Sequence, residues 1–166
     1  MGVYNWEDGR VYKGTWLQNN MHGVGFFTYE DGRRYKGQFK MDKKEGYGIY
    51  YWEDGRTFEG EWVKGKQQGI GIYKVPMQEV KFGYWEGGKR KIWFSEQEKK
   101  QIQEGSFDFE KEIENYKPSL SSIYSFKRPQ SLMRDLKAAK EEVKALYAFL
   151  KIEDYSDLSS LHSEIS

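Results

Sequence analysis

The side chains that could perform catalysis are few, and their spacing does not favour it. His22 and His162 are the only histidines, and neither lies in the spacing of a metal-ligand pair. Asp8, Asp31 and Asp54 recur in one short motif, Glu-Asp-Gly-Arg, in which the aspartate initiates a turn. We therefore predict no catalytic residue, no metal site and no cofactor, so that an enzyme would need chemistry from other parts of a longer protein.

Pairs of glycines at 23/25, 46/48 and 69/71 have only a superficial likeness to nucleotide-binding loops. They lead into strand patterns, and they lack both the third glycine and the following helix that cradle a phosphate. The sequence predicts no nucleotide site at these glycines.

The glycines and the aromatic residues recur instead at one constant interval, the separation of Gly14 from Gly37, which indicates tandem repeats. Glycine recurs at this repeat interval at Gly14, Gly37, Gly60 and Gly83. Large rings recur at Tyr12, Tyr35 and Phe58, and again at Trp16, Phe39, Trp62 and Trp85. The elements that position any binding site must therefore be copies of one unit.

Each unit is predicted to be a β-hairpin around its Glu-Asp-Gly turn. We favour a three-residue loop with Gly32 in the left-handed conformation, because it pairs Tyr29 with Arg33 and Phe27 with Tyr35. Large rings and glycines then share one face, and a ring can lie flat over a facing pair of glycines. The other face is partly apolar and must be covered. The links between hairpins, at 17–22, 40–45 and 63–68, are expected to be charged loops.

The pattern Tyr12-x-Gly14-x-Trp16, followed by His22-Gly23-x-Gly25 and Tyr29-x-Asp31-Gly32, resembles the MORN (membrane occupation and recognition nexus) repeat. The resemblance covers about residues 2–85. It implies a mainly β fold, an elongated twisted antiparallel sheet of tandem hairpins. It also implies a scaffold at the cell cortex, the cytoskeleton or the cilium, or a regulatory arm of an enzyme such as a lipid kinase.

The repeat array is expected to occupy residues 1–94, with atypical units at both ends. The first unit is partial, which predicts that the chain is a fragment of a longer array. In the fourth, Lys81 replaces the aromatic residue and the segment 75–79 replaces the turn, as expected of a capping unit.

Residues 95–166 are predicted to form a helical C-terminal extension, because glycine almost disappears there. A short helix should begin at the N-cap Ser95 and stop at Gly105. After a linker around 117–130, a longer helix over 131–152 carries an apolar seam of Leu132, Leu136, Ala139, Val143, Leu146 and Leu150. This seam could dock on the repeat sheet, bind another molecule or pair with a second copy.

These features predict a non-enzymatic interaction module whose aromatic groove binds a helix or an extended peptide, either of a partner or of its own C-terminal segment. The predicted contact residues are Tyr12, Trp16, Tyr35, Phe39, Phe58 and Trp62, with Trp6, Tyr29 and Trp52 near the turns. An alternative is binding to anionic phospholipid through the cluster Lys89, Arg90 and Lys91. A third alternative is a structural arm that sets distance or dimerises, so both monomer and homodimer remain open.

The composition limits the partners and the compartment. The net charge of +1 argues against a nucleic-acid binder. The chain has no cysteine, which favours a reducing cytoplasm. No apolar run approaches membrane-spanning length.

Overall fold

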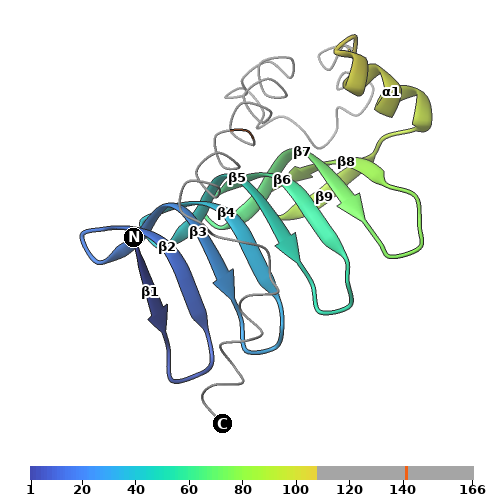
Figure 1. Cartoon of the computed structure of the whole chain (residues 1–166). Helices are drawn as coiled ribbons and strands as arrows, with labels where there is room; N and C mark the ends of the chain where they lie inside the picture. The colour runs from blue at the N-terminus through green and yellow to red at the C-terminus, as the bar shows by residue number, and fades with distance from the viewer. Residues whose placement is uncertain (108–140, 142–166) are drawn as a thin grey trace.

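The computed structural model describes residues 1–107 and Glu141 (Figure 1). In this part of the chain nine strands form one open, twisted sheet in which each strand pairs antiparallel with its neighbours in sequence. The strands are β1 (Gly2–Asn5), β2 (Val11–Leu17), β3 (Asn20–Thr28), β4 (Arg34–Lys40), β5 (Lys43–Tyr51), β6 (Thr57–Val63), β7 (Lys66–Lys74), β8 (Lys81–Glu86) and β9 (Lys89–Trp93). One helix, α1 (Glu96–Glu104), follows them. The predicted fold class, a mainly β array of tandem hairpins, is confirmed.

The Glu-Asp-Gly turns have the predicted three-residue geometry. Phe27 pairs with Tyr35, and the backbone N–H of Tyr29 donates to the carbonyl of Arg33 at 2.9 Å. Gly32 has φ 82°, in the left-handed region that the bulge requires. The side chain of Asp31 accepts from the backbone N–H and from Nε of Arg33, which closes the turn. The same pairs form at the two other copies of the motif.

The predicted loops between hairpins are wrong: the strands continue through them into two-residue turns. Both central residues of these turns have positive φ, for example 48° and 63° at Gln18 and Asn19, and 47° and 66° at Met41 and Asp42. This type I′ geometry matches the right-handed twist of the flanking strands. The polar composition of the segments hid the strands, because it lacks the alternation by which a strand is found.

A bulge in each of the first two units places three residues of one strand opposite a single residue of the preceding strand. In the first unit residues 22–24 of β3 lie opposite Thr15 of β2. The Thr15 hydroxyl donates to the carbonyl of His22 and accepts the N–H of Val24 at 3.0 Å. The side chain thus satisfies backbone groups that the bulge removes from the ladder.

Each face of the sheet carries its own cluster of buried side chains. The aromatic face holds the rings and glycines of the repeat. The second face carries a cluster at the β7–β9 end, where α1 packs: Ile70, Phe82, Tyr84, Ile92, Phe94, Ile102 and Phe107. Phe82, displaced by one position from the repeat pattern, therefore points into this second cluster.

Helix α1 has the predicted ends. Ser95 is its N-cap and forms a capping box with Glu98, and Gly105 closes it at φ 75°. Ile102 is the residue of α1 that is buried against the sheet. The linker around 117–130 and the predicted helix over 131–152 lie outside the described residues.

Candidate functional site: the aromatic face

The glycines of the aromatic face make room for rings. Tyr35 lies over the paired Gly37 and Gly48, so that a Cβ at Gly48 would overlap its ring. The Tyr35 hydroxyl crosses the glycines and donates to the carbonyl of Gln38 at 3.0 Å. Tyr12 makes the equivalent bond to the carbonyl of Thr15 at 2.9 Å. The predicted packing of ring on glycine is therefore present in this structure.

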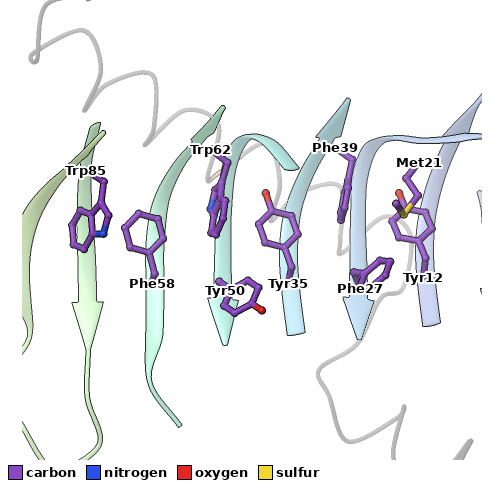
Figure 2. Packing of buried hydrophobic residues seen from close by; sticks show 9 residues of the cluster. All are labelled: Tyr12, Met21, Phe27, Tyr35, Phe39, Tyr50, Phe58, Trp62 and Trp85. Carbon is purple, nitrogen blue, oxygen red and sulfur yellow. The ribbon is translucent and has the colours of Figure 1, made fainter. Parts of the chain in front are cut away.

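These rings form a continuous inner row that runs across the strands. Neighbours meet edge to face, with centroids 4.7 to 5.5 Å apart and interplanar angles between 69° and 88°. Figure 2 shows rings from successive strands reaching toward one another along this line. The inner row consists of Trp16, Tyr12, Phe39, Tyr35, Trp62, Phe58 and Trp85.

A second, outer row of rings runs beside the first, closer to the Glu-Asp-Gly turns. Its neighbours lie 4.7 to 6.2 Å apart. The outer row consists of Trp6, Phe27, Tyr29, Tyr50, Trp52, Tyr73 and Trp93. It is joined to the inner row by Trp85 and Trp93 at 5.7 Å.

The rings differ in exposure, and this separates the predicted contact residues into two groups. The difference does not follow the rows strictly, because Phe27 and Tyr50 of the outer row are buried and Trp16 of the inner row is partly exposed. Tyr12, Tyr35 and Phe58 are 0% exposed, and Phe39 and Trp62 are also buried, so these five rings lie in the core. The partly exposed rings are Trp6, Trp16, Tyr29 and Trp52, together with Tyr73 and Trp93.

Tyr73 and Trp93 were not among the predicted contact residues. Tyr73 had a signal in the sequence, since Phe27, Tyr50 and Tyr73 are themselves separated by the repeat interval. Trp93 belongs to the last hairpin, where the repeat pattern has faded. Trp93 lies at the end of the outer row because it pairs with Gly83 of β8.

Lys44 lies among the rings in the middle of the aromatic face. Its Nζ is 4.5 Å from the ring centroid of Tyr50, 4.8 Å from Trp62, 5.5 Å from Tyr35 and 5.9 Å from Tyr29. Burial lowers the pKa of the Lys44 ammonium to about 8. Sequence reasoning missed this residue because it assigned 40–45 to a loop.

Positively charged side chains are concentrated at the end of the strands where the two-residue turns lie, which we call the basic edge. The exposed cations there include Lys40, Lys43, Lys64, Lys66 and Lys89. The opposite edge carries the exposed carboxylates of the Glu-Asp-Gly turns, Glu7, Asp8, Glu30, Asp31, Glu53 and Asp54. The three aspartates are ion-paired with Arg10, Arg33 and Arg56 of the same turns, so the charge there is mixed, whereas the two-residue turns are mainly basic.

The predicted lipid-binding cluster is divided among different partners. The Arg90 guanidinium lies 4.3 Å from the Trp93 centroid, on the aromatic face. Lys91 Nζ lies 3.6 Å from a carboxylate oxygen of Glu86. All three residues are exposed, but Arg90 and Lys91 also have these neighbours on the protein.

No cluster suited to metal binding occurs in the described residues, where no three His, Asp or Glu side chains gather to hold an ion. Among the same residues, no helix has the length and apolar character needed to cross a bilayer. What the described residues offer is an aromatic surface with charged side chains beside it.

Tandem hairpins that repeat at a fixed interval and stack rings on paired glycines define a β-hairpin repeat protein. The family model of the MORN repeat matches residues 12–33, 35–55 and 58–76. The chain therefore carries three MORN repeats over residues 12–76, which confirms the resemblance seen in these residues, and this repeat is of a non-catalytic type. The match ends before the hairpin β8–β9. A search of curated proteins found no match to the chain.

Proposed function

We propose that this protein is an interaction scaffold whose aromatic face binds a helix or an extended peptide. The observation that carries the proposal is the outer row, whose partly exposed rings extend across the sheet from Trp6 to Trp93. Partly exposed Trp and Tyr on a rigid support contribute most of the energy at many interfaces. The inner row fixes this support, since its rings are held by the glycine pairs beneath them.

The spacing of the repeats suits a linear ligand that crosses the strands. Two strands advance the sheet by about 9.6 Å per repeat. Seven residues of an α-helix rise about 10.5 Å and three residues of an extended peptide about 10 Å. A helix with an apolar seven-residue repeat can therefore present one side chain to each unit. The chain's own segment with Leu132, Leu136, Val143, Leu146 and Leu150 has this repeat and is one candidate ligand, beside a helix of a partner.

The setting that we propose is the cytoplasm, at the cytoskeleton, the cell cortex or the cilium. A second arrangement consistent with this function is a regulatory or dimerising arm of a larger enzyme, such as a lipid kinase. In both arrangements the aromatic face supplies the contact.

Capture of partners from a cell lysate tests the proposal, with the full chain as bait beside a Tyr29→Ala, Trp52→Ala variant. These two rings are partly exposed, so the fold should survive their loss better than the loss of the buried Tyr35 and Trp62. Val3→Ser is the matched control, because Val3 is 56% exposed and lies on the other face of the sheet.

We expect at least one protein to be retained by the parent chain and by Val3→Ser but not by the double variant. Circular dichroism of each bait shows whether the sheet is intact. If the intact double variant retains the same proteins as the parent chain, the aromatic face is not the binding site.

The basic edge supports a second candidate function, contact with an anionic membrane surface. Each cation near such a surface contributes about 1 kcal/mol, so a row of lysines gives measurable, salt-sensitive attraction. Sedimentation with phosphatidylserine vesicles should fall when Lys64, Lys66 and Lys89 are changed to Gln. Sedimentation that stays at the parent level in this triple variant would contradict a role for the edge.

A further inference from the structure

Lys44 is the charged group of the aromatic face whose position is least explained by the fold. Its ammonium lies among the rings of both rows, over Tyr50 and Trp62. Within the described part of the chain it forms no ion pair with a carboxylate. The attraction of the rings offsets part of the lost hydration, but no counter-charge from the described residues neutralises the ammonium.

The fold does not need a cation at this place. The positions one repeat interval before and after Lys44 hold Met21 in the preceding unit and Gln67 in the following one. Met21 is buried in the same aromatic cluster, so an uncharged side chain fills the space. Lys44 is therefore a feature of the central unit rather than of the repeat.

We infer that Lys44 is the specificity-determining residue of the aromatic face and that it binds a carboxylate of the bound peptide. This inference rests on the proposed function. The ligand it selects is a peptide whose apolar contact surface is interrupted by one Asp or Glu opposite the central unit.

The selection follows from the loss of water when a ligand covers the face. A carboxylate that meets the ammonium among the rings forms a charge-assisted hydrogen bond in a medium of low dielectric constant. A ligand without a carboxylate would bury the ammonium unpaired, and a cationic ligand residue would be repelled. The outer row supplies contact area for many apolar ligands, and Lys44 discriminates among them.

A peptide library tests the inference and needs no identified partner. Phage-displayed random peptides, long enough to cross the central units, are selected on the full chain and, in parallel, on Lys44→Met and Lys43→Met. Lys43→Met removes the same charge from the adjacent residue, which is exposed and points to the opposite face. Lys44→Arg keeps the charge at the site.

The inference expects an Asp or Glu between apolar residues in the peptides selected on the parent chain and on Lys43→Met. The same peptides should bind Lys44→Met at least about tenfold more weakly, which is the size of one lost charged hydrogen bond. Lys44→Arg should retain the preference for the acidic residue.

Failure of the inference is distinguishable from failure of the proposed function. Peptides that need Tyr29 and Trp52 but bind Lys44→Met as tightly as the parent chain would overturn the role of Lys44 and leave the aromatic face as the binding site. If no selected peptide depends on Tyr29 and Trp52, the proposed function itself fails, and the inference fails with it.

Discussion

At the scale of the residue, the glycine pairs explain how so many large rings fit on one sheet. The rings of Tyr35 and Tyr12 cover the backbone of the paired glycines. Their hydroxyls donate hydrogen bonds to carbonyl groups beyond those glycines. The sequence predicted this contact because both partners recur at the same interval. The sequence could not predict that Lys44 lies among the rings. The equivalent positions of the three units hold Met21, Lys44 and Gln67, so they share no residue type.

Gly48→Ala should destabilise the fold by about 2 kcal/mol, because the new Cβ would overlap the Tyr35 ring and force a shift in a packed core. Gly60 pairs directly with Gly48 and serves as the control, since a Cβ there would meet its nearest atom, on the Phe58 ring, at 3.0 Å. Urea unfolding of the three proteins measures the difference. Gly60→Ala should cost less than Gly48→Ala, and equal losses for the two substitutions would contradict the larger cost expected from the Tyr35 ring.

Lys44→Met should stabilise the protein at neutral pH by about 1 to 2 kcal/mol. The fall of the Lys44 pKa from 10.5 to about 8 on burial corresponds to roughly 3 kcal/mol. Loss of the attraction between the cation and the rings, about 1 to 2 kcal/mol, offsets part of this gain. Thermal unfolding measures the change, and the exposed Lys43→Met should alter the stability by less than about 0.5 kcal/mol.

The pH dependence of stability checks the same assignment. Between about pH 8 and pH 10 the unfolded chain holds a proton on Lys44 that the folded chain has lost, so the free energy of unfolding should rise with pH. Above about pH 10 it should fall, because burial raises the pKa of Tyr12 and the unfolded chain ionises first. Lys44→Met should lack the rise and keep the fall. A rise of equal size in Lys44→Met would contradict the assignment to Lys44.

At the scale of the element, the two kinds of turn explain why one could be predicted and the other could not. The Glu-Asp-Gly turn could be predicted because the same residues occur at all three copies. The two-residue turns use different residues at each copy, Gln18-Asn19, Met41-Asp42, Lys64-Gly65 and Gly87-Gly88, and share only their left-handed backbone. Neighbouring turns are also linked across the sheet, as where the N–H of Asp42 donates to the carbonyl of Met21 at 3.0 Å. Such a contact between units has no signal in the sequence.

Met41→Asn should stabilise the hairpin β4–β5. Met41 has φ 47°, a conformation that is costly for most side chains and that asparagine tolerates, so the expected gain is about 0.5 to 1 kcal/mol. Gly65→Ala should do the reverse at the next turn, where φ is 84° and no atom lies near enough to clash. Denaturant unfolding of the two variants tests the geometry of both turns. A stabilising Gly65→Ala would be incompatible with a left-handed residue there.

At the scale of the whole molecule, the sequence predicted which side chains share a face but not which of them remain accessible. Alternation along each strand places all the rings together. Whether a ring is buried or partly exposed depends on how it leans over its neighbours, and both kinds occur in each row. Tyr35 and Tyr29 occupy the same face, yet Tyr35 covers glycines and is buried, whereas Tyr29 lies beside the turn and keeps part of its surface exposed.

The charge distribution is also a property of the whole molecule. The net charge of +1 conceals a concentration of exposed lysines at the two-residue turns, because the two kinds of turn alternate along the chain and lie at opposite ends of the strands. A linear ligand on the aromatic face would lie between the two rows of turns. Its orientation would be set by its own charges as well as by Lys44.

The most direct test of the account is photo-crosslinking in cells from single positions of the full chain. A photoreactive phenylalanine analogue replaces Tyr29 in the outer row or, in the control, Val3 on the other face. The account predicts a discrete protein adduct from position 29 that Trp52→Ala abolishes, and no such adduct from position 3. An adduct from position 3 alone, or none from position 29 while the chain remains folded, would contradict the claim that the aromatic face is the binding surface.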